Sequence, residues 1–308
     1  MKSESNLEKV LKAGHFAFTG ELGPPQGANA ETVREKCGFL KGNVDMVNIT
    51  DNQTAVVRMS SLAASHIMIH EGLEPNFQMV CRDRNRLAIT SDILGAHALG
   101  IRNMLCLSGD HQHFGNHPEA KNVFDIDSMQ LIALVKMMRD EGTFMNGEEI
   151  DVPPKLFIGA ASNPFADPYE FRIYRLANKI DAGADFIQTQ CIYNMDRFRD
   201  FMKKAVDMGL AEEAYILAGV TPMKSTRMAQ YMAKKVPGID VPESLIKRLN
   251  ATGKGKQAEE GIKFAIEQIE EFKEMEGLSG VHLMAIEWEH KVPEIAERAN
   301  MLPRPKFE

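Results

Sequence analysis

Residues 100–110 read Gly-Ile-Arg-Asn-Met-Leu-Cys-Leu-Ser-Gly-Asp, an apolar run that stops abruptly at a polar triplet. This pattern is typical of a buried strand that ends in a turn. Residues 16–21 have the same form and end on Glu21, and residues 186–190 end on Gln190. In a parallel barrel the carboxyl ends of all strands meet at one mouth. We therefore expect Glu21, Asp110 and Gln190 to surround one site.

Short strand-like runs alternate with amphipathic helices along the whole chain, which indicates repeated βα units. The expected strands are residues 15–21, 46–51, 76–82, 103–108, 155–162, 186–193, 215–221 and 280–286. Helices are expected at 56–71, 125–141 and 168–182, the last with Arg172, Arg175 and Lys179 on one face. No GxGxxG motif follows the first strand, which disfavours a doubly wound dinucleotide-binding sheet. The pattern predicts a (β/α)8 TIM barrel.

One segment departs from the regular alternation. Residues 236–279 contain a helix that starts at Pro242, a turn at 253–255 and a long amphipathic helix before the last strand. The apolar stripe of the long helix is Ile262, Ala265, Ile266, Ile269 and Phe272. Such a stripe usually packs on a core. We expect a single domain over residues 1–308, with a helical insertion at about 236–279.

Composition narrows the class of protein. The chain has 308 residues, a net charge of -7, 44% hydrophobic and 26% charged residues. The acidic balance argues against a nucleic-acid partner, and no apolar run is long enough to span a membrane. Residues 1–9 are too polar for a secretory signal, so we expect a cytoplasmic protein.

The cysteines are scattered and form no CxxC pair, which disfavours a zinc ribbon or an iron–sulfur cluster in this chain. They are Cys37, Cys81, Cys106 and Cys191. We interpret them as buried, reduced core residues. Any redox chemistry must then come from a bound cofactor or a partner.

The loop after residue 110 carries His111, His113 and His117. Imidazoles at this spacing can share a metal ion, but no cysteine or paired carboxylate accompanies them. Solvated side chains or substrate contacts are the preferred interpretation, and no metal site is predicted.

The strand ends together form a ring of acids and neutral polar groups. They are Glu21, Thr50-Asp51, Arg82-Asp83, Ser108-Gly-Asp110, Ser162-Asn163, Gln190, Thr221 and Glu287. Glu21 directly follows an apolar strand and precedes Gly-Pro-Pro, a rigid setting that suits a general acid.

At this point the sequence resembles the methylenetetrahydrofolate reductases, flavoproteins built on a (β/α)8 barrel. The resemblance runs from Phe16 to Pro303. Its four motifs, in order, are Glu21-Leu-Gly-Pro-Pro25, Val47-Asn-Ile-Thr50, Gly100-Ile-Arg-Asn-(x)4-Ser-Gly-Asp110 and Lys179-Ile-Asp-Ala-Gly-Ala-(x)4-Thr-Gln190. Each is weak alone, but four in order at matching barrel positions are specific.

The resemblance implies reduction of 5,10-methylenetetrahydrofolate to 5-methyltetrahydrofolate, with the hydride supplied by a reduced flavin. The Glu21 position carries the family's general acid, which assists opening of the five-membered ring to an iminium ion. Asp110 lies where the family tunes the flavin and holds the substrate, and Gln190 where an amide binds the pterin. Thr226 stands near a further substrate-contacting position.

The resemblance also implies which residues hold the flavin, its ribityl chain and its phosphates. They are Thr50, Gln78, Ser108, Gly109, Asp110, Phe124, Ser162, Arg175 and Lys179.

Five residues depart from the better-known members of the family. Gln78 replaces a frequent His and Ser108 a frequent Arg, so the flavin can be FAD or FMN. Thr226 stands near a stacking Phe, and Glu287-Trp288 replaces Asn-Arg. These changes look more like reductases of anaerobic one-carbon pathways such as the Wood–Ljungdahl pathway, and methionine biosynthesis is the other one-carbon role that the family resemblance implies. They imply an iron–sulfur partner subunit as electron source, with NADH or NADPH as the other possible donor, and a homo- or hetero-oligomer.

Two alternatives stay open. A pterin-binding methyltransferase is also a barrel with polar strand ends, but it needs no flavin and gives no reason for Glu21 at the first strand. A non-catalytic barrel subunit of a redox complex would not require Glu21, Asp110 and Gln190 together. The carrier can also be a related pterin such as tetrahydromethanopterin.

Overall fold

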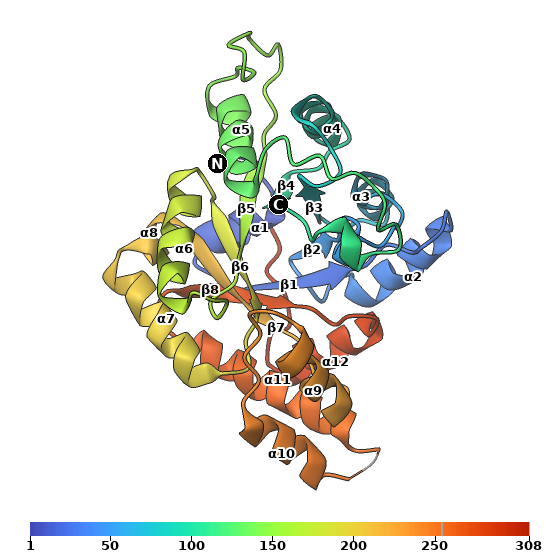
Figure 1. Ribbon diagram of the computed structural model, residues 1–308, viewed down its shortest axis with the longest axis vertical. Helices are drawn as coiled ribbons and strands as arrows, with labels where there is room; N and C mark the ends of the chain where they lie inside the picture. The colour runs from blue at the N-terminus through green and yellow to red at the C-terminus, as the bar shows by residue number, and fades with distance from the viewer. Residues whose placement is uncertain (254, 308) are drawn as a thin grey trace.

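The computed structural model describes residues 1–253 and 255–307 and is a closed barrel of eight parallel strands in sequential order (Figure 1). The strands are β1 (Ala17–Leu22), β2 (Met46–Ile49), β3 (Pro75–Val80), β4 (Asn103–Leu107), β5 (Phe157–Ser162), β6 (Phe186–Cys191), β7 (Tyr215–Val220) and β8 (Leu278–Leu283). Each coincides with one of the runs expected from the sequence, so the (β/α)8 barrel is confirmed. We call the carboxyl ends of the strands the mouth and their amino ends the floor.

Helices surround the barrel. They are α1 (Asn6–Lys12), α2 (Ala30–Leu40), α3 (Ser61–His70), α4 (Arg86–Ala98), α5 (Ser128–Asp140), α6 (Arg172–Asp181), α7 (Met195–Asp207), α8 (Leu210–Glu213), α9 (Thr226–Lys235), α10 (Glu243–Ala251), α11 (Gln257–Lys273) and α12 (Val292–Arg298). The 3-10 turns are η1 (Gln53–Ala55), η2 (Gln112–Phe114), η3 (Tyr169–Phe171) and η4 (Glu289–Lys291).

Capping side chains explain where several helices begin. The helix expected at 56–71 starts only at Ser61, because the Ser60 side chain accepts from Ala63 N and caps the first turn. The helix expected at 125–141 starts at Ser128, after a capping box between Asp127 and Gln130.

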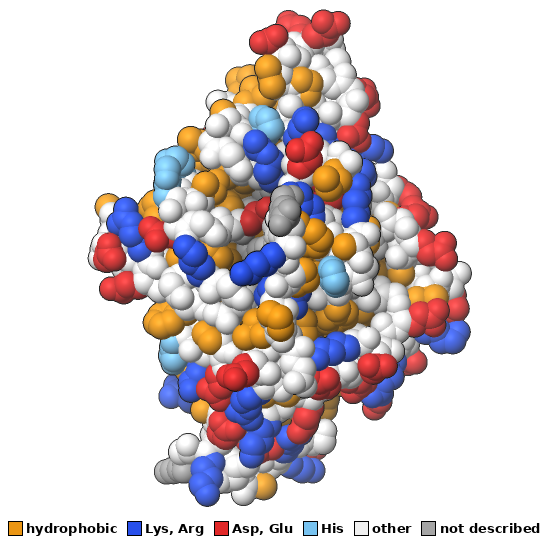
Figure 2. Space-filling view, turned by 180° about the vertical axis from the view of Figure 1, so that it is seen from behind, with side chains coloured by type: hydrophobic (Ala, Val, Ile, Leu, Met, Phe, Trp, Pro, Cys, Tyr) orange, Lys and Arg blue, Asp and Glu red, His pale blue; other side chains and the backbone are white. Residues whose placement is uncertain are grey.

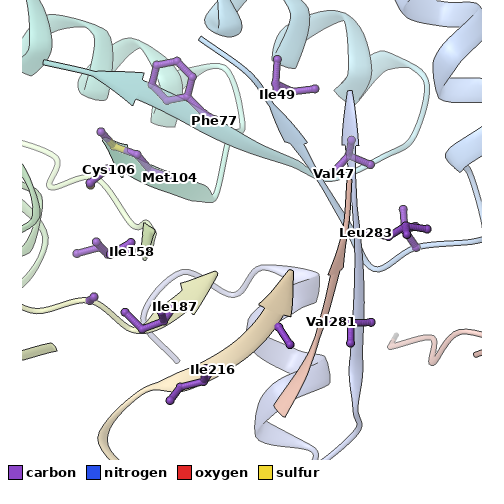
Figure 3. Close-up of a cluster of buried hydrophobic side chains, with 14 of the residues drawn as sticks. Val47, Ile49, Phe77, Met104, Cys106, Ile158, Ile187, Ile216, Val281 and Leu283 are labelled. Atoms are coloured by element: carbon purple, nitrogen blue, oxygen red, sulfur yellow. The ribbon is translucent and has the colours of Figure 1, made fainter. Parts of the chain in front are cut away.

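Side chains alternate between two environments along most of each strand, as the two-residue period of a strand requires, with register shifts in the pairs β6–β7 and β7–β8. One set of side chains points out into the layer between the strands and the surrounding helices, and Figure 3 shows ten labelled members of it. These are Val47, Ile49, Phe77, Met104, Cys106, Ile158, Ile187, Ile216, Val281 and Leu283. The residues between them point into the barrel.

The floor is closed by α1. Leu7, Val10 and Leu11 of this helix are buried against the first inward residues of the strands, including Phe157 and Phe186. The two phenylalanine rings stack with their centroids 5.3 Å apart. The lower part of the barrel interior is therefore largely apolar.

A carboxylate in α1 anchors the start of the chain to this floor. Glu8 accepts hydrogen bonds from the main-chain N–H groups of Lys2, Ser3 and Glu4 and forms an ion pair with Lys12. Burial opposes ionisation, but the N–H groups of Ser3 and Lys2, together with Lys12, outweigh it and lower the pKa of Glu8 to about 2.

The expected insertion divides into two parts. The long helix α11 packs against β7 and β8, the place of an ordinary barrel helix, and its stripe is buried as expected at Ile262, Ala265, Ile269 and Phe272. The other part is α10, which packs in a separate apolar cluster on α9, a helix that ends before the expected insertion. The turn expected at 253–255 includes residue 254, which lies outside the described residues.

Charges of both signs are interspersed over the face shown in Figure 2. The projection at its top is the loop between α5 and β5, where Glu148 and Glu149 are exposed. Within the described residues, every helix is too short or too polar to cross a membrane.

Candidate active site

Glu21 lies in β1 with its side chain pointing to the mouth and only 11% exposed. Its Oε2 is 3.6 Å from Nε2 of His282 in β8. In the strand register Glu21 is opposite Asn48 of β2, and Thr19, one inward position below, is opposite His282. The acid expected from the sequence is therefore held in a mostly buried niche formed by three strands.

Asp110 follows β4 on a tightly constrained turn. Gly109 has φ +90°, and a Cβ there would lie 3.0 Å from Val80 Cβ, so only glycine fits. Arg82 Nη1 donates to the main-chain carbonyl of Asp110 at 2.9 Å and holds this loop. The Asp110 side chain is exposed at the mouth and has no side-chain partner among the described residues.

A basic pocket of about 170 Å³ opens beside β5 and β6. Its lining includes Ser162, Arg172, Arg175, Lys179 and Gln190. This arrangement confirms the predicted cationic face of α6. It also places Gln190, an exposed residue of β6, beside these cations at the mouth.

Lys179 is the most buried cation of this pocket. Its Nζ donates to the main-chain carbonyl of Ala161. Burial, and next the nearby guanidinium of Arg175, lower the pKa of Lys179 to about 8. A phosphate in the pocket would restore the counter-charge that this lysine lacks.

The loops on the opposite side of the mouth are strained. Asn52, Thr54 and Ala55 after β2 and Phe124 before α5 all have positive φ angles, between 41° and 59°. A Cβ on Gly115 would lie 1.8 Å from the carbonyl oxygen of Ala55, so the two loops lie in direct contact. Strain of this kind concentrates at functional sites.

Some residues of the predicted ring have structural partners instead. Asp51 is buried, accepts from Val80 N at 3.0 Å and pairs with Arg84 at 2.7 Å. Arg82 pairs with Asp83 at 2.7 Å. These groups fix the loops of β2 and β3.

Glu287 lies at the far side of the ring. Its side chain is 62% exposed and pairs with Lys36 at 3.2 Å. Lys36 also pairs with Glu289, so the pair joins the loop after β8 to α2.

The remaining predicted residues are distributed as follows. Thr50 and Gln78 are buried at the ends of β2 and β3, and Ser108 Oγ accepts from Ser128 N at the start of α5. Thr50 Oγ1 has no hydrogen-bond partner within the described residues. Thr226 is 7% exposed at the first turn of α9, and its main-chain N–H donates to Gln257, so its side chain offers little surface to a substrate.

The histidine loop holds no preformed metal site. Among the described residues no three His, Cys, Asp or Glu side chains are placed to bind one ion. His111 Nδ1 instead accepts from His113 N.

Sequence reasoning missed a polar layer inside the barrel. Its members are Thr19, Asn48, Asn76, Gln188 and His282, all buried. A signal was available: Val47-Asn48-Ile49 and Val281-His282-Leu283 each place one polar residue between two apolar ones in a buried strand. In several strands, this pattern occurs at the same height along the barrel axis.

Comparison with known proteins gives the relatives of this chain. A probable methylenetetrahydrofolate reductase (NADPH) of Caenorhabditis elegans is 23% identical over 305 residues, covering 94% of this chain and 43% of that protein. The 5,10-methylenetetrahydrofolate reductase of Pectobacterium carotovorum is 24% identical and covers 71% of this chain and 68% of that protein. This chain thus spans less than half of the nematode protein.

A solved structure supports the fold. It is an uncharacterized protein from Clostridium thermocellum that binds two copies of 5-methyl-5,6,7,8-tetrahydrofolic acid, with a TM-score of 0.65 and 14% identity over 97% of this chain and 99% of that one. A 2,3-dimethylmalate lyase follows with a TM-score of 0.52 and 11% identity over 99% of this chain and 90% of the lyase. The family model of methylenetetrahydrofolate reductase matches residues 6–300, and the chain belongs to this family.

Proposed function

We propose that this protein reduces 5,10-methylenetetrahydrofolate to 5-methyltetrahydrofolate with a bound flavin, and that Glu21 is the general acid. The observation that carries the proposal is the position of Glu21: a nearly buried carboxyl at the carboxyl end of β1, at the same mouth as Asp110 and Gln190. Family membership supports the same reaction.

The residues present fit a flavin. A pocket lined by Arg172, Arg175 and Lys179 has the charge and size to receive a phosphate group. The buried Thr50 Oγ1, which lacks a partner within the described residues, fits a polar group of the cofactor. Ser108, Gly109, Phe124 and Ser162 would complete the site, and Gln78 would face the ring. When bound, the flavin supplies the hydride.

The protein's own groups then act on the folate. Glu21 gives a proton to the nitrogen that leaves when the five-membered ring opens, a step for which a positioned acid contributes roughly 10²–10⁴-fold. Gln190 orients the pterin through its amide. Asp110 adds a fixed negative charge at the same mouth and helps to hold the substrate.

We further propose that electrons reach the site from an iron–sulfur partner rather than directly from NADH or NADPH. Thr226 offers no aromatic surface on which a nicotinamide could stack. The four cysteines of the chain are buried and scattered, and burial raises the pKa of Cys37 and of Cys81 to about 12. Thiols of this kind are poor cluster ligands.

The remaining features of the proposal are a single barrel domain over residues 1–308, an oligomeric state, a cytoplasmic location and FAD or FMN as the flavin. The four buried cysteines, which form no disulfide, support a reducing compartment.

The test is anaerobic kinetics of the purified chain. A yellow protein whose reduced form is reoxidised by methylenetetrahydrofolate supports the reductase, whereas a colourless protein supports a methyltransferase-type barrel. In Glu21→Gln, flavin binding and reduction by an artificial dye should persist while methylene reduction falls roughly 10²-fold or more. Normal turnover in this variant would remove Glu21 from the chemistry. Rapid, saturable reduction by NADH would rule out the need for a partner.

A further inference from the structure

The strand that carries Gln190 is irregular where it reaches the mouth. The register of β6 against β7 shifts between Gln188 and Cys191. Between these two residues β6 has Thr189 and Gln190, whereas β7 has only Ala218. Two residues opposite one make a β-bulge, which bends its strand and often re-aims a side chain beside an active site.

The hydroxyl of Thr189 joins the two strands at this bulge. The main-chain N–H of Gly219 donates to Thr189 Oγ1 at 2.8 Å, and Thr189 Oγ1 donates to the carbonyl oxygen of Gln190 at 2.8 Å. A hydroxyl has one hydrogen and two lone pairs, so it can make both bonds at once. Because Thr189 is only 3% exposed, water does not compete for them. The hydroxyl is thus inserted between the main chains of β6 and β7.

Gly219 allows β7 to approach the bulge closely. A Cβ at this position would lie 2.4 Å from the carbonyl oxygen of Thr189 and 2.7 Å from that of Gln190. Both are main-chain atoms, so any side chain here would push the bulge away from β7. The pairing resumes after the bulge, where Ile192 N donates to Gly219 O at 2.9 Å. The Thr189 hydroxyl and the contact with Gly219 together fix the main chain of the bulge.

The position of Gln190 depends on this bulge. Thr189 has a register partner in β5, Ser162, but Gln190 has none among the described residues of β5 and β7. The side chain of Gln190 is exposed at the basic pocket, so its amide is available to a ligand. Since its main-chain carbonyl is held by Thr189, the hydroxyl of Thr189 determines where Gln190 stands at the mouth.

We infer that Thr189 is a positioning residue for Gln190: its hydroxyl, placed between the N–H of Gly219 and the carbonyl of Gln190, holds the bulge that presents the Gln190 amide to the folate. The inference rests on the proposed role of Gln190 in binding the pterin. Thr189 acts through Gln190, because its own side chain is buried. Loss of its hydroxyl leaves the Gly219 N–H without a partner and frees Gln190 to move, which should weaken folate binding.

The first experiment needs no folate. Hydrogen exchange measured by NMR reports the protection of the Gly219 N–H, and Leu217 in the same strand corrects for global stability. Thr189→Val keeps the shape of the side chain but lacks the hydroxyl, so we expect Gly219 to exchange about tenfold faster or more relative to Leu217. Thr189→Ser should retain the protection, and Thr90→Val in α4 is the matched control. Equal protection in wild type and Thr189→Val overturns the inference. Thr189→Ala removes the same hydroxyl if the valine variant does not fold.

The second experiment measures folate binding to the holoenzyme in a double-mutant cycle. We expect Thr189→Val to raise the Kd of 5-methyltetrahydrofolate by about tenfold, the value of one hydrogen bond, and Thr189→Ser to restore most of the affinity. Because Thr189 acts through Gln190, Thr189→Val should cause no further loss in a Gln190→Ala protein. Reduction of the flavin by an artificial dye should be the same in all of these variants.

The outcomes separate positioning from general damage to the barrel. Equal Kd values in wild type and Thr189→Val, or an undiminished effect of Thr189→Val in the Gln190→Ala protein, overturn the inference. If Gln190→Ala binds folate as tightly as wild type, the proposed pterin contact of Gln190 fails and the inference fails with it. A reduced protein that methylenetetrahydrofolate does not reoxidise contradicts the proposed function instead, and the exchange of Gly219 still decides whether the hydroxyl holds the bulge.

Discussion

Carboxylates lie at both ends of the barrel, but their surroundings differ. At the floor, Asp185 accepts from Lys2, Arg139 and the main-chain N–H of Ile158, and Asp45 is held by Arg304 and Phe18 N. At the mouth, Glu21 has one basic side chain within 4 Å among the described residues, that of His282, and Asp110 has no side-chain partner there.

The difference separates the carboxylates that stabilise the fold from those that are available to bind a ligand. Floor carboxylates have saturated hydrogen bonds and join the chain termini and the strand starts. At the mouth, Glu21 and Asp110 keep lone pairs available for a ligand. The other mouth carboxylates, Asp51, Asp83 and Glu287, are paired with Arg84, Arg82 and Lys36. Barrels in general place stability at the floor and chemistry at the mouth.

The largest effect should come from the floor. Asp185→Ala leaves the buried guanidinium of Arg139 without one of its partners, so the free energy of unfolding should fall by about 3–5 kcal/mol. Urea denaturation measures it. Asp110→Ala at the mouth should change it by less than about 0.5 kcal/mol. Equal losses of unfolding free energy in the two variants would contradict the proposed difference between floor and mouth.

The second-largest effect should come from a glycine at the mouth, Gly109. In Gly109→Ala the new Cβ meets Val80 in a left-handed backbone, so we expect a loss of about 1–3 kcal/mol in unfolding free energy and weaker flavin retention. Gly147→Ala is the matched control, because it has φ +85° but open space around its Cβ position. If both variants lose the same stability and both retain flavin, close packing of Gly109 has no role.

Asp110→Asn should act on binding and not on folding. Removing the exposed charge should raise the flavin midpoint potential and weaken folate binding by about tenfold, the value of one charged hydrogen bond. A redox titration and a folate titration measure the two effects. Glu148→Gln, on the exposed loop after α5, serves as the control and should leave both quantities unchanged.

The smallest effect should be a pH dependence at the basic pocket. Burial, then Arg175, lower the pKa of Lys179 to about 8, so the lysine loses its charge as the pH rises through about 8. Affinity for the flavin phosphate should fall across this range by less than about tenfold. The dependence should vanish in Lys179→Met and persist in Lys203→Met, which alters an exposed lysine of α7.

The lowered pKa of Lys179 can also be tested in the protein without a ligand. The folded pKa of Lys179 lies below the usual 10.5, so the unfolded chain binds more protons between about 8 and 10.5. This group alone should therefore make the free protein more stable as the pH rises through that window. A thermal-unfolding series that shows no difference between wild type and Lys179→Met across the window would contradict the assigned burial.

Much of the fold was predictable because it depends on local patterns. The eight strands follow from short apolar runs ending in polar turns, and the Arg172, Arg175 and Lys179 face follows from helical spacing. The helix starts were less predictable, since they depend on single caps such as Ser60. The burial of Thr226 could not be foreseen, because it depends on how α9 meets α11.

The sequence by itself determined that this protein is a (β/α)8 barrel and that Glu21, Asp110 and Gln190 end strands at one mouth, because strand alternation and parallel closure leave few other arrangements. Only the tertiary structure decided what surrounds the acid. Thr19 and His282 are 263 residues apart in the chain, and they meet because the closing pair of strands, β1 and β8, adopts one register out of several. A shift of one residue would turn His282 outward, since side chains alternate along a strand.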